Sequence, residues 1–80
     1  MNDPIERIVA DGLTSADIEF VVDGEDDRCK GLDFYLPAHD VHIEVKQFHT
    51  DRVSEQMARA ENVIVIQGKR AAETFAALLT

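Results

Sequence analysis

Cysteine is almost absent from this sequence of 80 residues, and long apolar runs are absent altogether. A lone Cys29 can form neither an internal disulfide nor a zinc site by itself, which favours a reducing compartment. Apolar runs such as residues 63–66 are far shorter than the roughly 20 residues needed to span a bilayer. We therefore expect a cytoplasmic protein without a membrane-spanning segment.

Positive charge is scarce as well. The chain has eight Lys plus Arg against sixteen Asp plus Glu, which gives a net charge of −8 and a pI of about 4.6. Proteins that coat nucleic acid electrostatically usually carry a basic patch and a high pI, so the composition disfavours that class. The hydrophobic fraction of 45 % and charged fraction of 30 % are typical of a globular protein, and the length predicts one domain over residues 1–80.

Three segments have the apolar spacing of amphipathic helices. Asp3 can cap the first, over residues 4–11, and Gly12 is a reasonable stop. The second begins at residue 50 or 51 and runs to about residue 60, and the third covers about 70–79 after a turn at Gly68. Their apolar stripes are Ile5, Ile8 and Val9; Val53, Met57 and Ala60; and Ala72, Phe75, Ala76 and Leu79.

Four β-rich segments are separated by these helices and by polar turns. They cover residues 18–22, 32–36, 41–46 and 62–67. The last contains Val-Ile-Val-Ile, which is typical of a strand buried on both faces, such as a parallel strand covered by helices. The sequence therefore predicts an α/β protein with a mixed sheet of the α+β kind, in the order α-β-β-β-α-β-α.

The second and third strands are expected to form a hairpin, because a four-residue loop over 37–40 separates two alternating segments. The apolar pairs in the expected register are Leu36 with Val41, Phe34 with Ile43, and Leu32 with Val45. All six side chains then share one face. The opposite face carries Asp33, Tyr35, His42, Glu44 and Lys46.

This register places Asp33 directly opposite Glu44, with Lys46 two residues further along the same face. Two opposed carboxylates repel each other, and a divalent cation such as Mg²⁺ relieves that repulsion. A neighbouring lysine can position a water molecule or neutralise a phosphate in the transition state. The alternative is a polar outer face on which Lys46 forms an incidental ion pair.

Asp33-Phe-Tyr-Leu-Pro, followed by Ile43-Glu44-Val45-Lys46, resembles the motif of the PD-(D/E)XK nucleases, which have the restriction-endonuclease-like fold. The resemblance implies that Asp33, Glu44 and the Val45 carbonyl bind Mg²⁺ or Mn²⁺, and that Lys46 is catalytic. Gly31 and Leu32 precede Asp33 where that family often has proline.

The resemblance extends to two further residues and to the assembly. Gln56, ten residues after Lys46, resembles the helix glutamine of the virus-type replication-repair nuclease branch (VRR-NUC), and Glu6 resembles the acidic residue of the family's first helix. That branch and the related Holliday-junction resolvases imply DNA as the partner and a homodimer. The alternatives are a capping-box role for Glu6 and a solvent-facing position for Gln56.

Several other polar residues follow or flank the motif. His42 and His49 could contact a phosphate, although an ordinary, partly exposed strand histidine is the alternative for His42. The basic residues of the C-terminal half could form a positive rim or be solvated separately. They are Arg52, Arg59, Lys69 and Arg70.

Two functions of different classes follow from the sequence. The first is a Mg²⁺-dependent nuclease that acts on DNA. The second is a catalytically inactive protein of the same fold that serves as an acidic protein-binding or DNA-mimic module, for example in a phage or mobile element. A metal-dependent phosphohydrolase of small substrates is a third option, which only the carboxylates support.

Overall fold

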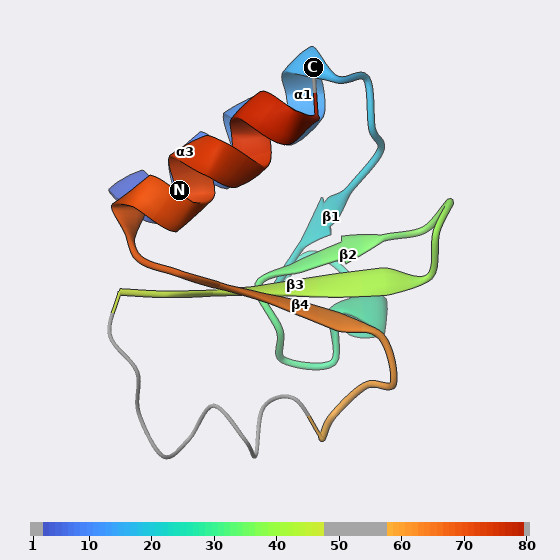
Figure 1. Ribbon diagram of the computed structural model, residues 1–80. Helices are drawn as coiled ribbons and strands as arrows, with labels where there is room; N and C mark the ends of the chain where they lie inside the picture. The colour runs from blue at the N-terminus through green and yellow to red at the C-terminus, as the bar shows by residue number, and fades with distance from the viewer. Residues whose placement is uncertain (1–2, 48–57, 80) are drawn as a thin grey trace.

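A computed structural model describes residues 3–47 and 58–79 of the chain. Over these residues the protein is a small α+β domain, in which a four-stranded mixed sheet packs against two α-helices (Figure 1). The helices are α1 (Pro4–Ser15) and α3 (Lys69–Leu78), with a short 3-10 helix, η1 (Asp27–Cys29). No helix in the described part of the chain is long and apolar enough to cross a membrane.

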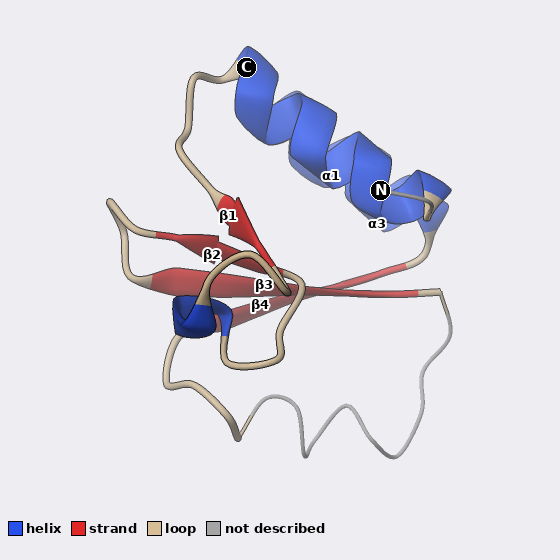
Figure 2. Ribbon diagram, turned by 180° about the vertical axis from the view of Figure 1, so that it is seen from behind, coloured by secondary structure: helices blue, strands red, loops and turns tan. Residues whose placement is uncertain are grey.

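The sheet has the strand order β1-β2-β3-β4. Its strands are β1 (Val21–Val22), β2 (Phe34–Leu36), β3 (Val41–Lys46) and β4 (Val63–Gln67). β1 and β2 pair antiparallel, as do β2 and β3, whereas β3 and β4 are parallel. Both views show α1 and α3 side by side over one face of the sheet (Figures 1 and 2).

The predicted hairpin register is confirmed where the strands are paired. Phe34 lies opposite Ile43 and Leu36 lies opposite Val41. Their side chains point to the helix face, where the buried core also includes Val9 of α1. β2 begins only at Phe34, so Leu32 and Asp33 lie before the strand rather than in it.

The first helix is longer than predicted. Asp3 caps it as expected, since its Oδ1 accepts a hydrogen bond from Ile5 N at 2.8 Å. The expected stop at Gly12 is wrong, because α1 continues to Ser15. The helix ends where Asp17 adopts a left-handed backbone conformation (φ 59°) and Ile18 N donates to Leu13 O at 2.9 Å.

Gly12 instead allows α1 and α3 to approach each other closely. A Cβ atom at Gly12 would lie 2.7 Å from Ala76 Cβ and 3.0 Å from Ala76 Cα. The glycine therefore marks a crossing point between two helices. A sequence pattern alone does not distinguish such a contact from a helix stop.

The remaining differences concern the strands and the second helix. The strand predicted over 18–22 is reduced to β1, and residues 58–60 form a turn rather than the end of a helix. The rest of that predicted helix lies outside the described residues. β4 is not fully buried, because it is the last strand of the sheet: on the helix face Ile66 is buried but Ile64 is 40 % exposed, and on the other face Gln67 is exposed.

Cys29 is buried, and its thiol lies 3.6 Å from the Val21 carbonyl oxygen. Burial raises the pKa of this thiol, so it stays protonated and poorly reactive. This environment is that of a structural cysteine.

We predict that Gly12→Ala destabilises the protein, although alanine normally favours a helix. The added methyl group overlaps Ala76, and overpacking of this kind costs about 1–3 kcal/mol. Thermal and urea unfolding measure the change, with Asp11→Ala as the control on the exposed side of α1. Ala76→Gly in the Gly12→Ala background should recover part of the loss, and a Gly12→Ala protein of unchanged or higher stability would contradict the contact.

Candidate functional site

Asp33 lies where the hydrogen-bond ladder between β2 and β3 ends. Its Oδ2 accepts a hydrogen bond from Val45 N at 2.7 Å, and its backbone carbonyl accepts from Asp23 N at 3.1 Å. Because β2 begins at Phe34, the Asp33 carboxylate takes the position that a strand carbonyl would otherwise occupy. The interaction fixes this carboxylate at the end of the sheet, next to Glu44.

Glu44 is a buried carboxylate in the centre of β3, with only 2 % of its surface exposed. Burial is the main cause that raises its pKa to about 7, and hydrogen bonding and charge from Asp33 add to the shift. Lys46 opposes the shift, since its Nζ lies 3.2 Å from Glu44 Oε2. The expected neighbourhood of Asp33, Glu44 and Lys46 is therefore present in the structure.

Glu6 approaches the same site from α1. Its pKa is also raised to about 7, first by burial and then by the charges of Asp33 and Asp3. The N-terminal turn of α1 contains half of the expected capping box: Asp3 accepts from the Glu6 backbone N–H at 3.4 Å. Among the described residues, no hydrogen bond runs back from the Glu6 side chain to Asp3 N–H.

The oxygen atoms available at this site suit a cation that takes few protein ligands. Asp33 and Glu44 offer carboxylate oxygens, and the Val45 carbonyl points toward the Asp33 side, because the N–H and C=O of one strand residue point the same way. Mg²⁺ typically takes one or two carboxylates and completes its shell with water and phosphate. In residues 3–47 and 58–79, no group of three or more His, Cys, Asp or Glu side chains is placed to hold a metal.

Gln56 and His49 lie outside the described residues, as does Arg52, so the structure does not place them. Gln47 is exposed after β3 and lines a shallow pocket with Asp3, Pro4 and Ile5. The end of β3 and the start of α1 therefore meet beside the carboxylates.

His42 lies on the same face of β3 but is not the partly exposed histidine that the sequence suggested. It is 3 % exposed, its ring packs against Tyr35 with the centroids 4.6 Å apart and the planes tilted by 40°, and its Nε2 lies 2.8 Å from the Arg28 carbonyl oxygen. The second side of β3 is covered here by η1 and the turn that follows it. This explains why β3 is buried on its polar face at His42.

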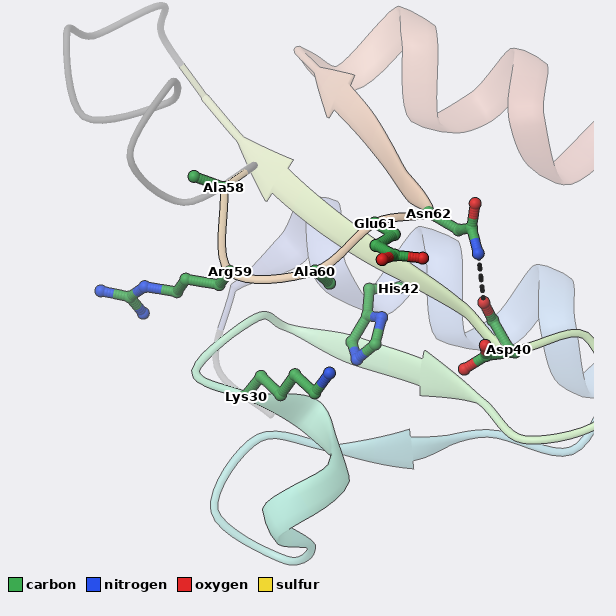
Figure 3. Close-up of a pocket in the computed structure, with 8 residues that line it drawn as sticks. All are labelled: Lys30, Asp40, His42, Ala58, Arg59, Ala60, Glu61 and Asn62. Atoms are coloured by element: carbon green, nitrogen blue, oxygen red, sulfur yellow. Dashed lines mark hydrogen bonds between the residues drawn. The ribbon is translucent and has the colours of Figure 1, made fainter.

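Sequence reasoning did not find the pocket at the other end of β3 (Figure 3). The pocket has a volume of about 260 Å³, and its polar lining is Lys30, Asp40, His42, Arg59, Glu61 and Asn62. These residues come from three separate segments of the chain, so no local sequence motif indicates the pocket. Both signs of charge are present, and the carboxylates of the Asp33 site are not part of its wall.

Comparison with protein-family models, curated proteins and solved structures finds no match to this chain. The functional argument therefore rests on the geometry of Asp33, Glu44 and Lys46, with Glu6 beside them.

The raised pKa values predict how the stability of the metal-free protein depends on pH. Folding raises the pKa of Glu44 and Glu6 from 4.5 to about 7, so between these values the folded state binds more protons than the unfolded state. The stability that these groups contribute is fully present below the lower value and is lost as the pH rises through the upper one. Urea unfolding across this pH range measures the effect.

Glu44→Gln separates this contribution from those of other carboxylates. The variant should lose less stability with rising pH than the wild type and exceed it at neutral pH by on the order of 3 kcal/mol, since one pKa unit corresponds to about 1.4 kcal/mol. Glu73→Gln on the exposed side of α3 is the control and should follow the wild type. Parallel curves for wild type and Glu44→Gln would contradict the buried, proton-binding Glu44.

Proposed function

We propose that this protein is a divalent-metal-dependent nuclease of the PD-(D/E)XK type, with a restriction-endonuclease-like core, that hydrolyses phosphodiester bonds in DNA. The observation that carries the proposal is the placement of Glu44: a carboxylate 2 % exposed, held beside Asp33 and 3.2 Å from the Lys46 ammonium. Repulsion between the two carboxylates makes the pair a favourable place for a cation. The mixed sheet with its hairpin and parallel fourth strand supports the fold assignment.

Asp33, Glu44 and the Val45 carbonyl would hold the cation. A bound Mg²⁺ or Mn²⁺ would polarise a phosphate oxygen and lower the pKa of a water molecule. Asp33 is fixed for this task by its hydrogen bond from Val45 N, which keeps the carboxylate at the end of the ladder. Glu44 is fixed by burial and by Lys46.

Lys46 would act on the reacting phosphate. Its side chain is 23 % exposed, whereas that of Glu44 is 2 % exposed, so the ammonium lies between the buried carboxylate and solvent. A positive charge at that boundary can orient an attacking water molecule and stabilise charge that develops on phosphate oxygens. Glu6 would support the site through Asp33, and Gln56, by the family resemblance, would order the substrate or Lys46.

The acidic surface favours a second candidate function. The net charge is −8, and the exposed turn over residues 23–25 is followed by Asp26 and Asp27. A catalytically inactive protein with this charge could occupy a basic, DNA-binding partner in place of DNA. In that case the ion pair between Glu44 and Lys46 would only stabilise the polar face of the sheet.

Cleavage of a panel of labelled DNAs, including single strands, duplexes, flaps and a four-way junction, distinguishes the two functions. With Mg²⁺ or Mn²⁺ present, we expect cleavage by the wild type and a loss of roughly 100-fold or more in Glu44→Gln and Lys46→Met, as for removal of one group that stabilises a transition state. Glu73→Gln and Lys30→Met are the matched controls and should cleave normally.

Two results would contradict the nuclease. Absence of cleavage on every substrate with either metal would favour the acidic binding module. Cleavage that persists undiminished in both Glu44→Gln and Lys46→Met would show that these residues do not form the active centre. Circular dichroism of each variant confirms that the loss is not due to unfolding.

A further inference from the structure

The pocket at the start of β3 contains a buried polar atom that lacks a partner (Figure 3). His42 is 3 % exposed and forms part of the pocket wall. Its Nε2 lies 2.8 Å from the Arg28 carbonyl oxygen, and because a carbonyl only accepts, Nε2 is assigned the hydrogen. Nδ1 is then an acceptor, and nothing in the described part of the chain donates to it. Buried polar atoms are almost always paired, so Nδ1 is a natural place for a donor from a bound molecule.

Two charged side chains of the same wall are also unpaired. Lys30 follows η1 and Glu61 precedes β4, and both line the pocket. Neither forms an ion pair within residues 3–47 and 58–79, although their charges are opposite. Figure 3 shows the Lys30 ammonium and the Glu61 carboxylate on different sides of the His42 ring. The pocket therefore keeps a cation and an anion apart, and each is available to a ligand.

The remaining polar residues of the wall already have partners. Asp40 Oδ1 accepts a hydrogen bond from the Tyr35 hydroxyl at 3.0 Å, and Asn62 Nδ2 donates to the Asp40 carbonyl oxygen at 3.4 Å. Arg59 Nη1 donates to the Gly31 carbonyl oxygen at 3.4 Å, and Figure 3 shows the Arg59 side chain pointing away from the rest of the wall. One ammonium, one carboxylate and one neutral acceptor are therefore the groups that a ligand can satisfy.

We propose that this pocket binds an amino acid in its zwitterionic form. The carboxylate of the ligand pairs with Lys30, and its ammonium donates hydrogen bonds to His42 Nδ1 and to Glu61. A simple anion would leave the acceptor and Glu61 without partners, and a simple amine would leave Lys30 without one. A molecule that carries both charges satisfies all three groups at once.

The size and the lining of the pocket agree with a ligand of this kind. Its volume of about 260 Å³ is below the roughly 300–1,000 Å³ of sites for drug-sized ligands, so the occupant is small. Ala58 and Ala60 add apolar wall against which the carbon skeleton can lie. Lys30 and Glu61 are exposed whereas His42 is buried, so the charged groups lie at an open rim and the neutral acceptor lies at the floor.

This site is separate from the proposed nuclease centre. His42 and Glu44 lie on the same face of β3, but none of Asp33, Glu44 and Lys46 lines the pocket. The pocket also needs no metal ion, since its ligand carries both charges. The proposal therefore does not depend on the nuclease function, and its tests measure binding alone.

Titration of the isotope-labelled full chain with each of the common amino acids, followed by NMR, tests the ligand class. We expect saturable shifts of the Glu61 and Asn62 amide signals, and a shift of the His42 Nδ1 signal toward that of a hydrogen-bonded acceptor. For the amino acid that binds best, the matched compounds are the acid without the amino group and the amine without the carboxylate. For alanine these are propionate and ethylamine.

Each matched compound should bind at least about tenfold more weakly than the amino acid, because it loses a charged hydrogen bond. Equal binding of the acid or of the amine would show that one charge is sufficient and would overturn the zwitterion. Absence of binding by every amino acid at millimolar concentration would overturn the site. An unchanged His42 Nδ1 signal at saturation would contradict the role of this acceptor.

Two variants test the charged groups. Lys30→Met and Glu61→Gln each remove one charge at an exposed position, so folding is unaffected. Each should weaken binding of the best amino acid about tenfold. Lys69→Met and Glu73→Gln, at exposed positions of α3, are the matched controls and should bind like the wild type. Undiminished binding by Lys30→Met or by Glu61→Gln would overturn the proposal.

Discussion

The burial of Glu44 is the constraint on which the rest of the site depends. A carboxylate that is 2 % exposed cannot keep its charge at low energetic cost unless a cation compensates it. Lys46 supplies part of that compensation at 3.2 Å, but burial, together with the hydrogen bond and negative charge of Asp33, raises the pKa of Glu44 to about 7. Two carboxylates therefore lie beside a single ammonium, and a divalent cation would compensate the remaining negative charge.

The fold brings these charged groups together where the start of β2, the end of β3 and the start of α1 meet. Because β2 begins only at Phe34, the backbone N–H of Val45 is free to bind the Asp33 carboxylate, and the N-terminal turn of α1 adds Glu6 beside it. The crossing of α1 over α3 at Gly12 fixes the helix layer behind the sheet. Features that lie far apart in the sequence thus position the charged groups of this one site.

The hairpin and its register could be predicted from the sequence, because alternation is strict and a one-residue slip would reverse both faces. That register alone predicts that Asp33, Glu44 and Lys46 lie close together. The burial of His42 could not be predicted, since it depends on η1 packing over β3 from elsewhere in the chain, and strand alternation alone does not indicate that Glu44 is buried. Gly12 was interpreted wrongly for a similar reason: its role is set by Ala76, more than sixty residues away.

Direct titration of the protein with Mg²⁺ and Mn²⁺ in a calorimeter tests the central claim, which is that Asp33 and Glu44 hold a divalent cation. The account predicts saturable binding by the wild type and by Glu73→Gln, and its loss in Glu44→Gln. Absence of binding for both metals would contradict the account. Equally, undiminished binding by Glu44→Gln would mean that the cation sits elsewhere and that the buried carboxylate is not its ligand.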